Sequence, residues 1–103
     1  MSRSRFKINY SDNSVDEIQK TFEHYMNLNG YKEKLLKNER VWLKGDGVIT
    51  LMQCFRISYG DKAFTIEAWT KDALFGESEL EGFSGWLIKS KMKDLIQEMI
   101  SSF

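Results

Sequence analysis

The one cysteine and the one histidine are the residue types in this chain best suited to nucleophilic catalysis. A catalytic thiol needs a base within hydrogen-bonding distance. His24 falls in a predicted helix, away from its apolar stripe, whereas Cys54 falls in a predicted strand. Because Cys54 is expected on the sheet face that the helices leave uncovered, pairing the two would require crossing the core. We therefore predict no catalytic residue and a protein that is not an enzyme.

Carboxylates and glycine turns offer two further chemistries. Glu77, Glu79 and Glu81 alternate, and such side chains could bind a hard cation or act as acid and base. No Asp-x-Asp-x-Gly loop accompanies them, so we interpret them as solvated. Gly45-Asp46-Gly47 lacks the further glycines and the following helix of a phosphate-binding loop, and it is predicted to be a hairpin turn. A single cysteine cannot supply a zinc cluster, and we expect neither a metal nor a cofactor.

Basic side chains gather at two places in the sequence. They are Lys89, Lys91 and Lys93 at the start of the last predicted helix, and Arg3, Arg5 and Lys7 near the N-terminus. The whole chain carries 15 basic and 15 acidic residues, which removes the long-range field of a general nucleic-acid binder. Aromatic residues do not interleave with these lysines and arginines. We interpret them as solvated charge and expect no nucleic-acid partner.

Length and composition predict one folded unit. The chain has 103 residues, of which 42% are hydrophobic, and we expect a single domain over 1–103. No apolar stretch approaches the roughly 20 residues of a membrane span, and the first residues lack the apolar core of a secretory signal. We therefore expect no membrane insertion. One unpaired cysteine favours the cytoplasm.

Hydrophobic periodicity predicts the secondary structure. Period-two alternation predicts strands at 5–10, 40–44, 48–59 and 63–70. Ser14 and Glu17 form a capping-box pattern, and a helix is predicted from 15 to 29, where Gly30 can end it. Residues 71–83 contain two glycines and no sustained period, which indicates a long loop. Helical spacing returns after Ser84-Gly85, at Ile88, Met92, Leu95, Met99 and Ile100. The fold class is α+β, an antiparallel sheet with two helices on one face in the order β-α-β-β-β-α.

Two glycine turns predict how the strands pair. If Gly60-Asp61 is a two-residue loop, Tyr59 faces Lys62, Phe55 faces Ile66 and Met52 faces Trp69. If Gly45-Asp46-Gly47 is a three-residue loop, Arg40 faces Met52. The resulting core face carries Val41, Leu43, Ile49, Leu51, Phe55, Ile57, Phe64, Ile66 and Ala68.

The opposite sheet face is unusually aromatic in this register. It carries Arg40, Trp42, Met52, Cys54, Arg56, Glu67 and Trp69. Such residues on an open antiparallel sheet suggest that something covers them. Three explanations stay open: the loop at 71–83 folds back with Leu74, Phe75, Leu80 and Phe83, a partner or second copy binds there, or a small molecule does.

These observations lead to two functional hypotheses. The first is a non-enzymatic interaction or regulatory module that forms a homo-oligomer or binds a protein partner. Its predicted interaction face consists of Arg40, Trp42, Met52, Cys54, Glu67 and Trp69. The alternative is a small-ligand binding domain with a pocket between 71–83 and this face.

Several short segments also resemble a known family. They are Gly30-Tyr31, Glu39-Arg40-Val41-Trp42, Lys44-Gly45-Asp46-Gly47, Phe64-Thr65-Ile66-Glu67-Ala68-Trp69 and Glu81-Gly82-Phe83. Together they resemble a small bacterial domain of uncharacterised function that often follows an N-terminal zinc ribbon, in some cases joined to membrane segments. The similarity covers most of residues 6–100. This chain has neither the Cys-x-x-Cys pairs of the ribbon nor a membrane segment, so the resemblance implies the domain alone and transfers no catalytic residue.

Overall fold

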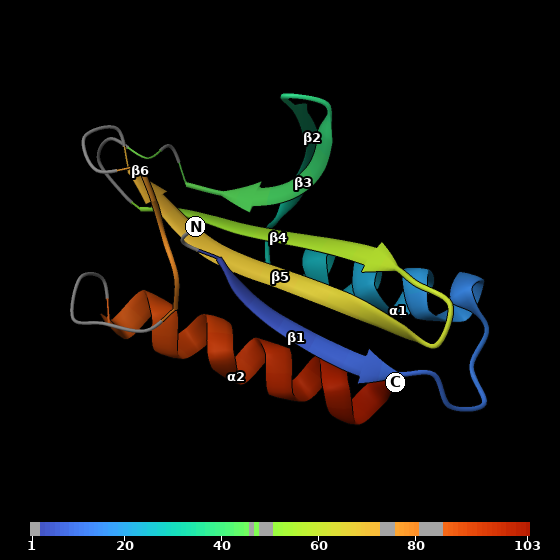
Figure 1. Cartoon of the computed structure of the whole chain (residues 1–103). Coiled ribbons are helices and arrows are strands. Elements are labelled where there is room, and N and C mark those ends of the chain that lie inside the picture. Colours follow the sequence, from blue (N-terminus) through green and yellow to red (C-terminus); the bar gives the residue numbers. More distant parts are fainter. Residues whose placement is uncertain (1–2, 46, 48–50, 73–75, 81–85) are drawn as a thin grey trace.

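Two helices and six strands form the described part of the computed structural model (Figure 1). The structure describes residues 3–45, 47, 51–72, 76–80 and 86–103. In chain order the elements are β1 (Ser4–Asn9), α1 (Val15–Leu28), β2 (Lys32–Leu36), β3 (Glu39–Lys44), β4 (Met52–Tyr59), β5 (Ala63–Asp72), β6 (Gly76–Ser78) and α2 (Trp86–Ser102). The α+β class and the order β-α-β-β-β-α are confirmed, with β2 and β6 added to the expected strands.

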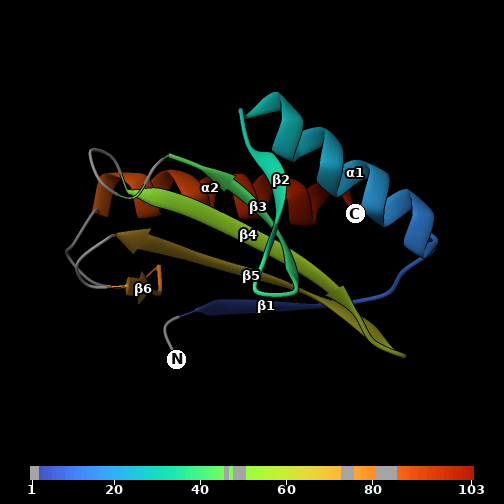
Figure 2. The same ribbon diagram turned by 90° about the horizontal axis from the view of Figure 1, so that it is seen from above.

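The sheet separates two environments. Its strands follow the order β1-β5-β4-β3-β2, all neighbours are antiparallel, and β6 pairs with the end of β5. Both helices lie on the same side of this sheet, as expected (Figure 2). We call that side the helix face and the opposite side the far face. The tip of the β2–β3 hairpin lies on the side away from the helices, so it borders the far face (Figure 2).

The first helix begins and ends as its sequence indicates. The Ser14 side chain accepts a hydrogen bond from the backbone N–H of Glu17, and the Glu17 carboxylate accepts one from the N–H of Ser14. This reciprocal capping box satisfies two donors that a helix start leaves free. Gly30 has a φ of +83°, in the left-handed region that favours glycine after a helix. The chain then turns into β2.

The β4–β5 pairing differs from the predicted register by two residues. Tyr59 lies opposite Phe64, and Phe55 lies opposite Ala68 rather than Ile66. The predicted two-residue loop Gly60-Asp61 requires a positive φ at its first residue, whereas Gly60 does not have one. Because side chains alternate with period two, a shift of two leaves each residue on its predicted face. Phe55 therefore still faces the helices and Trp69 still faces away.

The β3–β4 pairing corrects the prediction more strongly. Trp42 lies opposite Phe55 and Leu43 opposite Cys54, so the register differs from the predicted one by an odd number of residues. An odd shift exchanges the two faces of a strand. Trp42 is consequently in the helix-face core, and the predicted core residues Val41 and Leu43 are on the far face. The predicted partner Ile49 lies outside the described residues.

The β2 strand was missed because its sequence shows no alternation. All five of its residues are exposed, so no buried face imposes a period-two pattern. Its turn into β3 uses Lys37 and Asn38, which both have positive φ, at 48° and 67°. This is the backbone shape of a type I′ hairpin turn, but it lacks the glycine that usually signals one. Residues 32–44 therefore form a regular hairpin, of which the sequence predicted only the second strand.

The main core lies between the helices and the sheet. Its buried members are Ile18, Phe22, Met26, Tyr31, Trp42, Phe55, Phe64, Ile66, Ala68, Leu80, Met92, Leu95, Ile96 and Met99. Phe6 and Ile8 of β1 pack against it, as their alternation predicted. A smaller buried cluster, consisting of Val41, Leu43, Cys54 and Trp69, lies on the far face with Met52 against it. The sheet is thus packed on both faces.

The segment predicted as a loop over 71–83 is more ordered than expected in its described part. β5 continues to Asp72, and β6 returns beside it. Leu80 enters the helix-face core instead of covering the far face. The predicted covering residues Leu74, Phe75 and Phe83 lie outside the described part of the chain. Among the described helices, none has the length and apolar character needed to cross a membrane.

Candidate functional site

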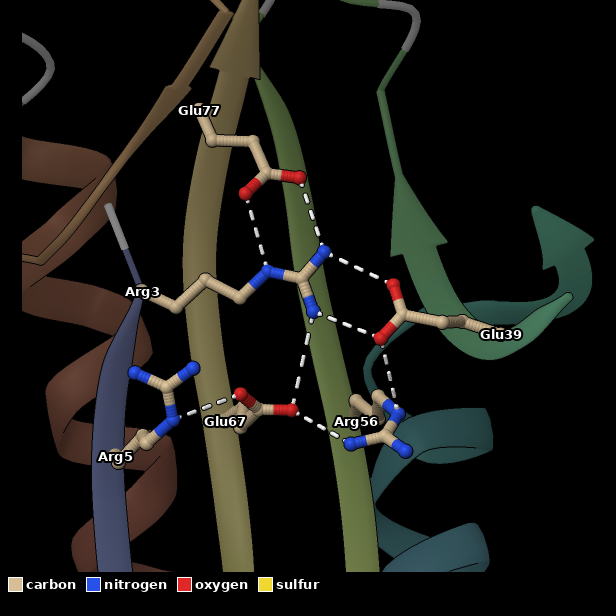
Figure 3. A network of polar contacts seen from close by, with 6 residues as sticks. All are labelled: Arg3, Arg5, Glu39, Arg56, Glu67 and Glu77. Carbon is tan, nitrogen blue, oxygen red and sulfur yellow. Dashed lines mark hydrogen bonds and ion pairs between the residues drawn. The ribbon is translucent and has the colours of Figure 1, made fainter. Parts of the chain in front are cut away.

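A cluster of charged side chains covers the middle of the far face (Figure 3). The Arg3 guanidinium donates to both carboxylate oxygens of Glu77, at 3.1 and 3.0 Å. It also donates to both oxygens of Glu39, at 3.1 and 3.0 Å. Two bidentate pairs use the planar fork of donors that arginine provides. We call these three residues the Arg3 clamp.

The Arg3 clamp lies over an indole ring. The guanidinium carbon of Arg3 is 3.7 Å from the centroid of the Trp69 ring. Trp69 is 2% exposed and the neighbouring Cys54 is 1% exposed. Ser4 pairs with Ala68, so Arg3 precedes β1 at the level of Trp69. The chain's own arginine therefore provides the cover that the aromatic far face was expected to need.

A second charged row crosses the sheet beside the clamp (Figure 3). Glu67 of β5 lies opposite Arg5 of β1 and opposite Arg56 of β4. The Glu67 carboxylate is 3.0 Å from Arg5 Nε and 2.7 Å from Arg56 Nη1. Arg56 also lies 3.5 Å from Glu39, and Arg3 lies 3.8 Å from Glu67. The clamp and this row thus form one network that joins strands β1, β3, β4, β5 and β6.

The network changes how its members titrate. Hydrogen bonds from Arg3 lower the pKa of Glu39 and of Glu77, and the hydrogen bond to Glu77 is the largest cause that raises the pKa of Arg3. Burial raises the pKa of the Cys54 thiol to about 12, and the charge of Glu77 adds to that shift. A thiol in this state is neutral at physiological pH and a poor nucleophile.

A hollow of about 150 Å³ adjoins the clamp on the far face. Its floor consists of Val41, Met52, Cys54 and Trp69. The Arg3 clamp forms one wall, and Lys37 from the β2–β3 turn and Lys71 from β5 complete the lining together with Leu36. In this hollow, apolar buried residues and several charged groups border the same open space.

The predicted interaction face is not one exposed surface. Met52, Cys54, Glu67 and Trp69 do lie on the far face, but Cys54, Glu67 and Trp69 are buried. Two members were placed wrongly. Trp42 is 8% exposed in the helix-face core. Arg40 shares the face of Trp42 on β3, and the β3–β4 register does not bring it opposite Met52 as predicted. On its other side it lies opposite Leu35 of β2, and its guanidinium is 3.6 Å from Glu33. The odd register shift of β3 explains both errors.

The remaining candidates also separate in the structure. His24 is exposed on α1, on the other side of the sheet from Cys54, which agrees with the predicted separation. Glu77 is not a solvated carboxylate as predicted, since Arg3 binds it, whereas Glu79 is exposed. Glu81 lies outside the described residues. The structure therefore pairs Glu77 with Arg3, which the sequence analysis had grouped with the basic residues near the N-terminus.

The two basic groups of the sequence lie in different surroundings. Arg3 and Arg5 belong to the far-face network and are not simply solvated. Lys89 is 2% exposed, and its ammonium group donates to Ser78 Oγ at 3.0 Å. The interpretation of Lys89 as solvated charge is therefore wrong, because its side chain is buried against Ser78 of β6. Lys91 is exposed as predicted.

The Arg3 clamp itself was missed by sequence reasoning. Arg3 is 36 residues from Glu39 and 74 residues from Glu77. No local pattern relates residues so far apart. One usable signal existed in the alternation of Arg3 and Arg5 with Phe6 and Ile8, because it places these arginines on the strand face away from the apolar residues.

Comparison with known proteins adds no relative. No family model matches the chain, and no curated protein and no solved structure matches it either. The resemblance to the domain found after zinc ribbons therefore stays a prediction. In the described ranges, no group of three or more histidine, cysteine or acidic side chains is arranged to hold a metal ion.

Proposed function

We propose that this protein is a non-enzymatic interaction module that binds an extended, acidic segment of a partner protein along the outer edge of β2. The observation that carries this proposal is the exposure of all five residues of β2 at the end of the sheet. Among the described residues, no backbone hydrogen bond joins the edge of β2 that faces away from β3 to another segment.

An open strand edge is a template for another strand. Its unpaired backbone N–H and C=O groups can extend the sheet by one extended segment, and nearby side chains then select the sequence. Two exposed leucines belong to this strand, Leu35 at 65% and Leu36 at 37% exposure. An added segment would cover apolar surface as well as pair with the backbone.

Charge favours an acidic segment over a second copy. Lys32 and Lys34 lie on the same face of β2, and neither makes an ion pair within the described structure. Acidic residues opposite these lysines would stabilise an added strand. In an antiparallel pairing of two copies that uses all of residues 32–36, Lys34 would lie opposite Lys34. Like charges directly opposite each other are destabilising.

The chemistry of the remaining candidates supports a role without catalysis. Cys54 is a buried, neutral thiol under the Arg3 clamp, and His24 lies beyond the sheet from it. We place the protein in the cytoplasm as part of this proposal, because a free thiol suits a reducing compartment.

A peptide titration followed by NMR tests the proposal. The probe is an extended peptide of alternating glutamate and valine, and the matched control peptide alternates lysine and valine. We expect the acidic peptide to shift the amide signals of 32–36 and to slow their hydrogen exchange at least tenfold, with little effect of the basic peptide. Equal responses to both peptides, or shifts that spare 32–36, would contradict it.

Two leucines of similar exposure provide a matched pair of variants. Leu35→Glu should weaken binding of the acidic peptide at least fivefold, because it adds a like charge at the edge. Leu87→Glu should leave it unchanged, since Leu87 is 59% exposed on α2, which lies on the β1 side of the sheet and away from β2 (Figure 1). Sedimentation equilibrium covers the remaining alternative. If the wild-type chain forms a concentration-dependent dimer and Leu35→Glu abolishes it, the occupant of the β2 edge is a second copy of this chain and not a partner segment.

A further inference from the structure

The far-face hollow has the composition of a small-ligand site. Its floor is apolar and includes an indole, a thioether and a neutral thiol, from Trp69, Met52 and Cys54. Small-molecule sites are typically concave and mostly apolar, with a few polar groups that orient the ligand. The hollow touches the end of β2 through Leu36, but it lies on the far face and not along the outer edge of β2, to which the proposed function belongs.

Two lysine side chains of the hollow make no close polar contact. Neither the Lys37 nor the Lys71 ammonium group forms an ion pair or a hydrogen bond within the described part of the chain, although Lys71 lies opposite Glu77 and its charge helps to lower the pKa of that carboxyl. The two carboxylates in the lining, Glu39 and Glu77, instead each accept two hydrogen bonds from Arg3, one on each oxygen. The positive charge of the two lysines is therefore available to a ligand, while the negative charge of the wall is already neutralised in part.

Size narrows the class of ligand. The hollow measures about 150 Å³. A cavity of about this volume in a protein core can hold a benzene ring. A dianion would be repelled by Glu39 and Glu77, and a cation would be repelled by Lys37 and Lys71. A single negative charge on a compact apolar body agrees best with both the volume and the charges.

We propose that the far-face hollow binds a small organic monocarboxylate, whose apolar body lies against Val41, Met52 and Trp69 and whose carboxylate meets Lys37 and Lys71. The Arg3 clamp closes one side of the site and holds the Trp69 ring in place. Binding would need no movement of the sheet, because the floor belongs to strands β3, β4 and β5.

Three probes of nearly equal shape test the charge requirement. They are benzoate, benzamide and benzylammonium, titrated against the intact chain while the indole N–H signal of Trp69 is followed by NMR. We expect saturable binding of benzoate, at least tenfold tighter than that of benzamide, and no saturation with benzylammonium. Equal affinity for benzoate and benzamide would overturn the proposal.

Lysine variants locate the site. Lys37→Ala and Lys71→Ala should each weaken benzoate binding at least threefold, and the double variant at least tenfold. Lys62→Ala is the control, since Lys62 is exposed in the β4–β5 turn. Benzoate binding that survives the double variant, or that Lys62→Ala weakens equally, would reject the hollow as the carboxylate site.

Protection of Cys54 provides an independent readout. Bound benzoate should slow the reaction of Cys54 with methyl methanethiosulfonate in proportion to occupancy, and benzylammonium should not. Unchanged reactivity at saturating benzoate would place the ligand elsewhere. These signals arise from Trp69 and Cys54, so their failure is distinguishable from a failure of acidic-peptide binding at β2.

Discussion

The guanidinium carbon of Arg3 lies 3.7 Å from the ring centroid of Trp69, and this contact covers the far face. An arginine above an indole gains a cation–π attraction, and its apolar stem excludes water from the ring. Glu39 and Glu77 hold the guanidinium in this position from two sides. The contact explains how a tryptophan on the face away from both helices is buried.

Removal of Arg3 should expose Trp69. Arg3→Ala should lower the free energy of unfolding by about 1 to 3 kcal/mol, because it removes charge-assisted hydrogen bonds and leaves two carboxylates unpaired. Arg3→Lys should recover less than half of that loss, since an ammonium group cannot make both bidentate pairs. Urea unfolding measures the stability, and acrylamide quenching measures the exposure of the indole.

Quenching needs a background without Trp86, which is 60% exposed and would dominate the signal. In Trp86→Phe, we expect Arg3→Ala to raise the quenching constant at least twofold. Arg40→Ala is the control, since the Arg40 side chain is 75% exposed and forms one ion pair of 3.6 Å. Identical quenching of the Arg3 and Arg40 variants would contradict the clamp.

The clamp also predicts a dependence of stability on acid. Arg3 lowers the folded-state pKa of Glu39 and Glu77, so their contribution is complete above about pH 4, the unfolded value, and is lost as the pH falls through the folded values. The double variant Glu39→Gln/Glu77→Gln should be less stable than the wild type at pH 7. It should also lose less stability than the wild type between about pH 5 and 3. Urea unfolding at several pH values checks this. Glu79→Gln, at an exposed position, should keep the wild-type slope.

The Cys54 thiol should react slowly in the folded protein. With its pKa raised to about 12 by burial, little thiolate is present at pH 8, and the reagent has little access. We expect Ellman's reagent to react at least about a hundredfold more slowly than in urea. Arg3→Ala should accelerate the reaction and Arg40→Ala should not. A fast reaction in the wild-type protein would instead indicate an activated, exposed thiol.

Trp42 should behave as a core residue and not as part of an interaction surface. Its ring packs at 87° against Phe22, with centroids 6.3 Å apart. Trp42→Ala should therefore cost about 3 to 5 kcal/mol of unfolding free energy. Trp86→Ala, on the exposed start of α2, should change stability by about 0.5 kcal/mol or less. Thermal unfolding compares the two, and a neutral Trp42→Ala would reject the β3 register.

Local signals were sufficient for part of the fold. The capping box at Ser14 and Glu17 depends on neighbouring backbone groups, so it could be recognised from four consecutive residues. The faces of β4 and β5 could be predicted as well, because period-two alternation separates Phe55 from Cys54 whatever the loop between the strands. The predicted β4–β5 register was wrong by two residues, but an even shift leaves each residue on its predicted face of the sheet.

What required the tertiary structure was every relationship between distant segments. The place of Trp42 depends on the β3–β4 register, and the sequence alone did not predict this register correctly. The Arg3 clamp depends on β1 lying beside β5, which brings together residues 36 and 74 positions apart. Side-chain alternation is a property of a single strand, whereas charge pairing across a sheet depends on which strands become neighbours. The sequence therefore determined which side chains share a strand face, and the folded sheet decided that Arg3 covers Trp69.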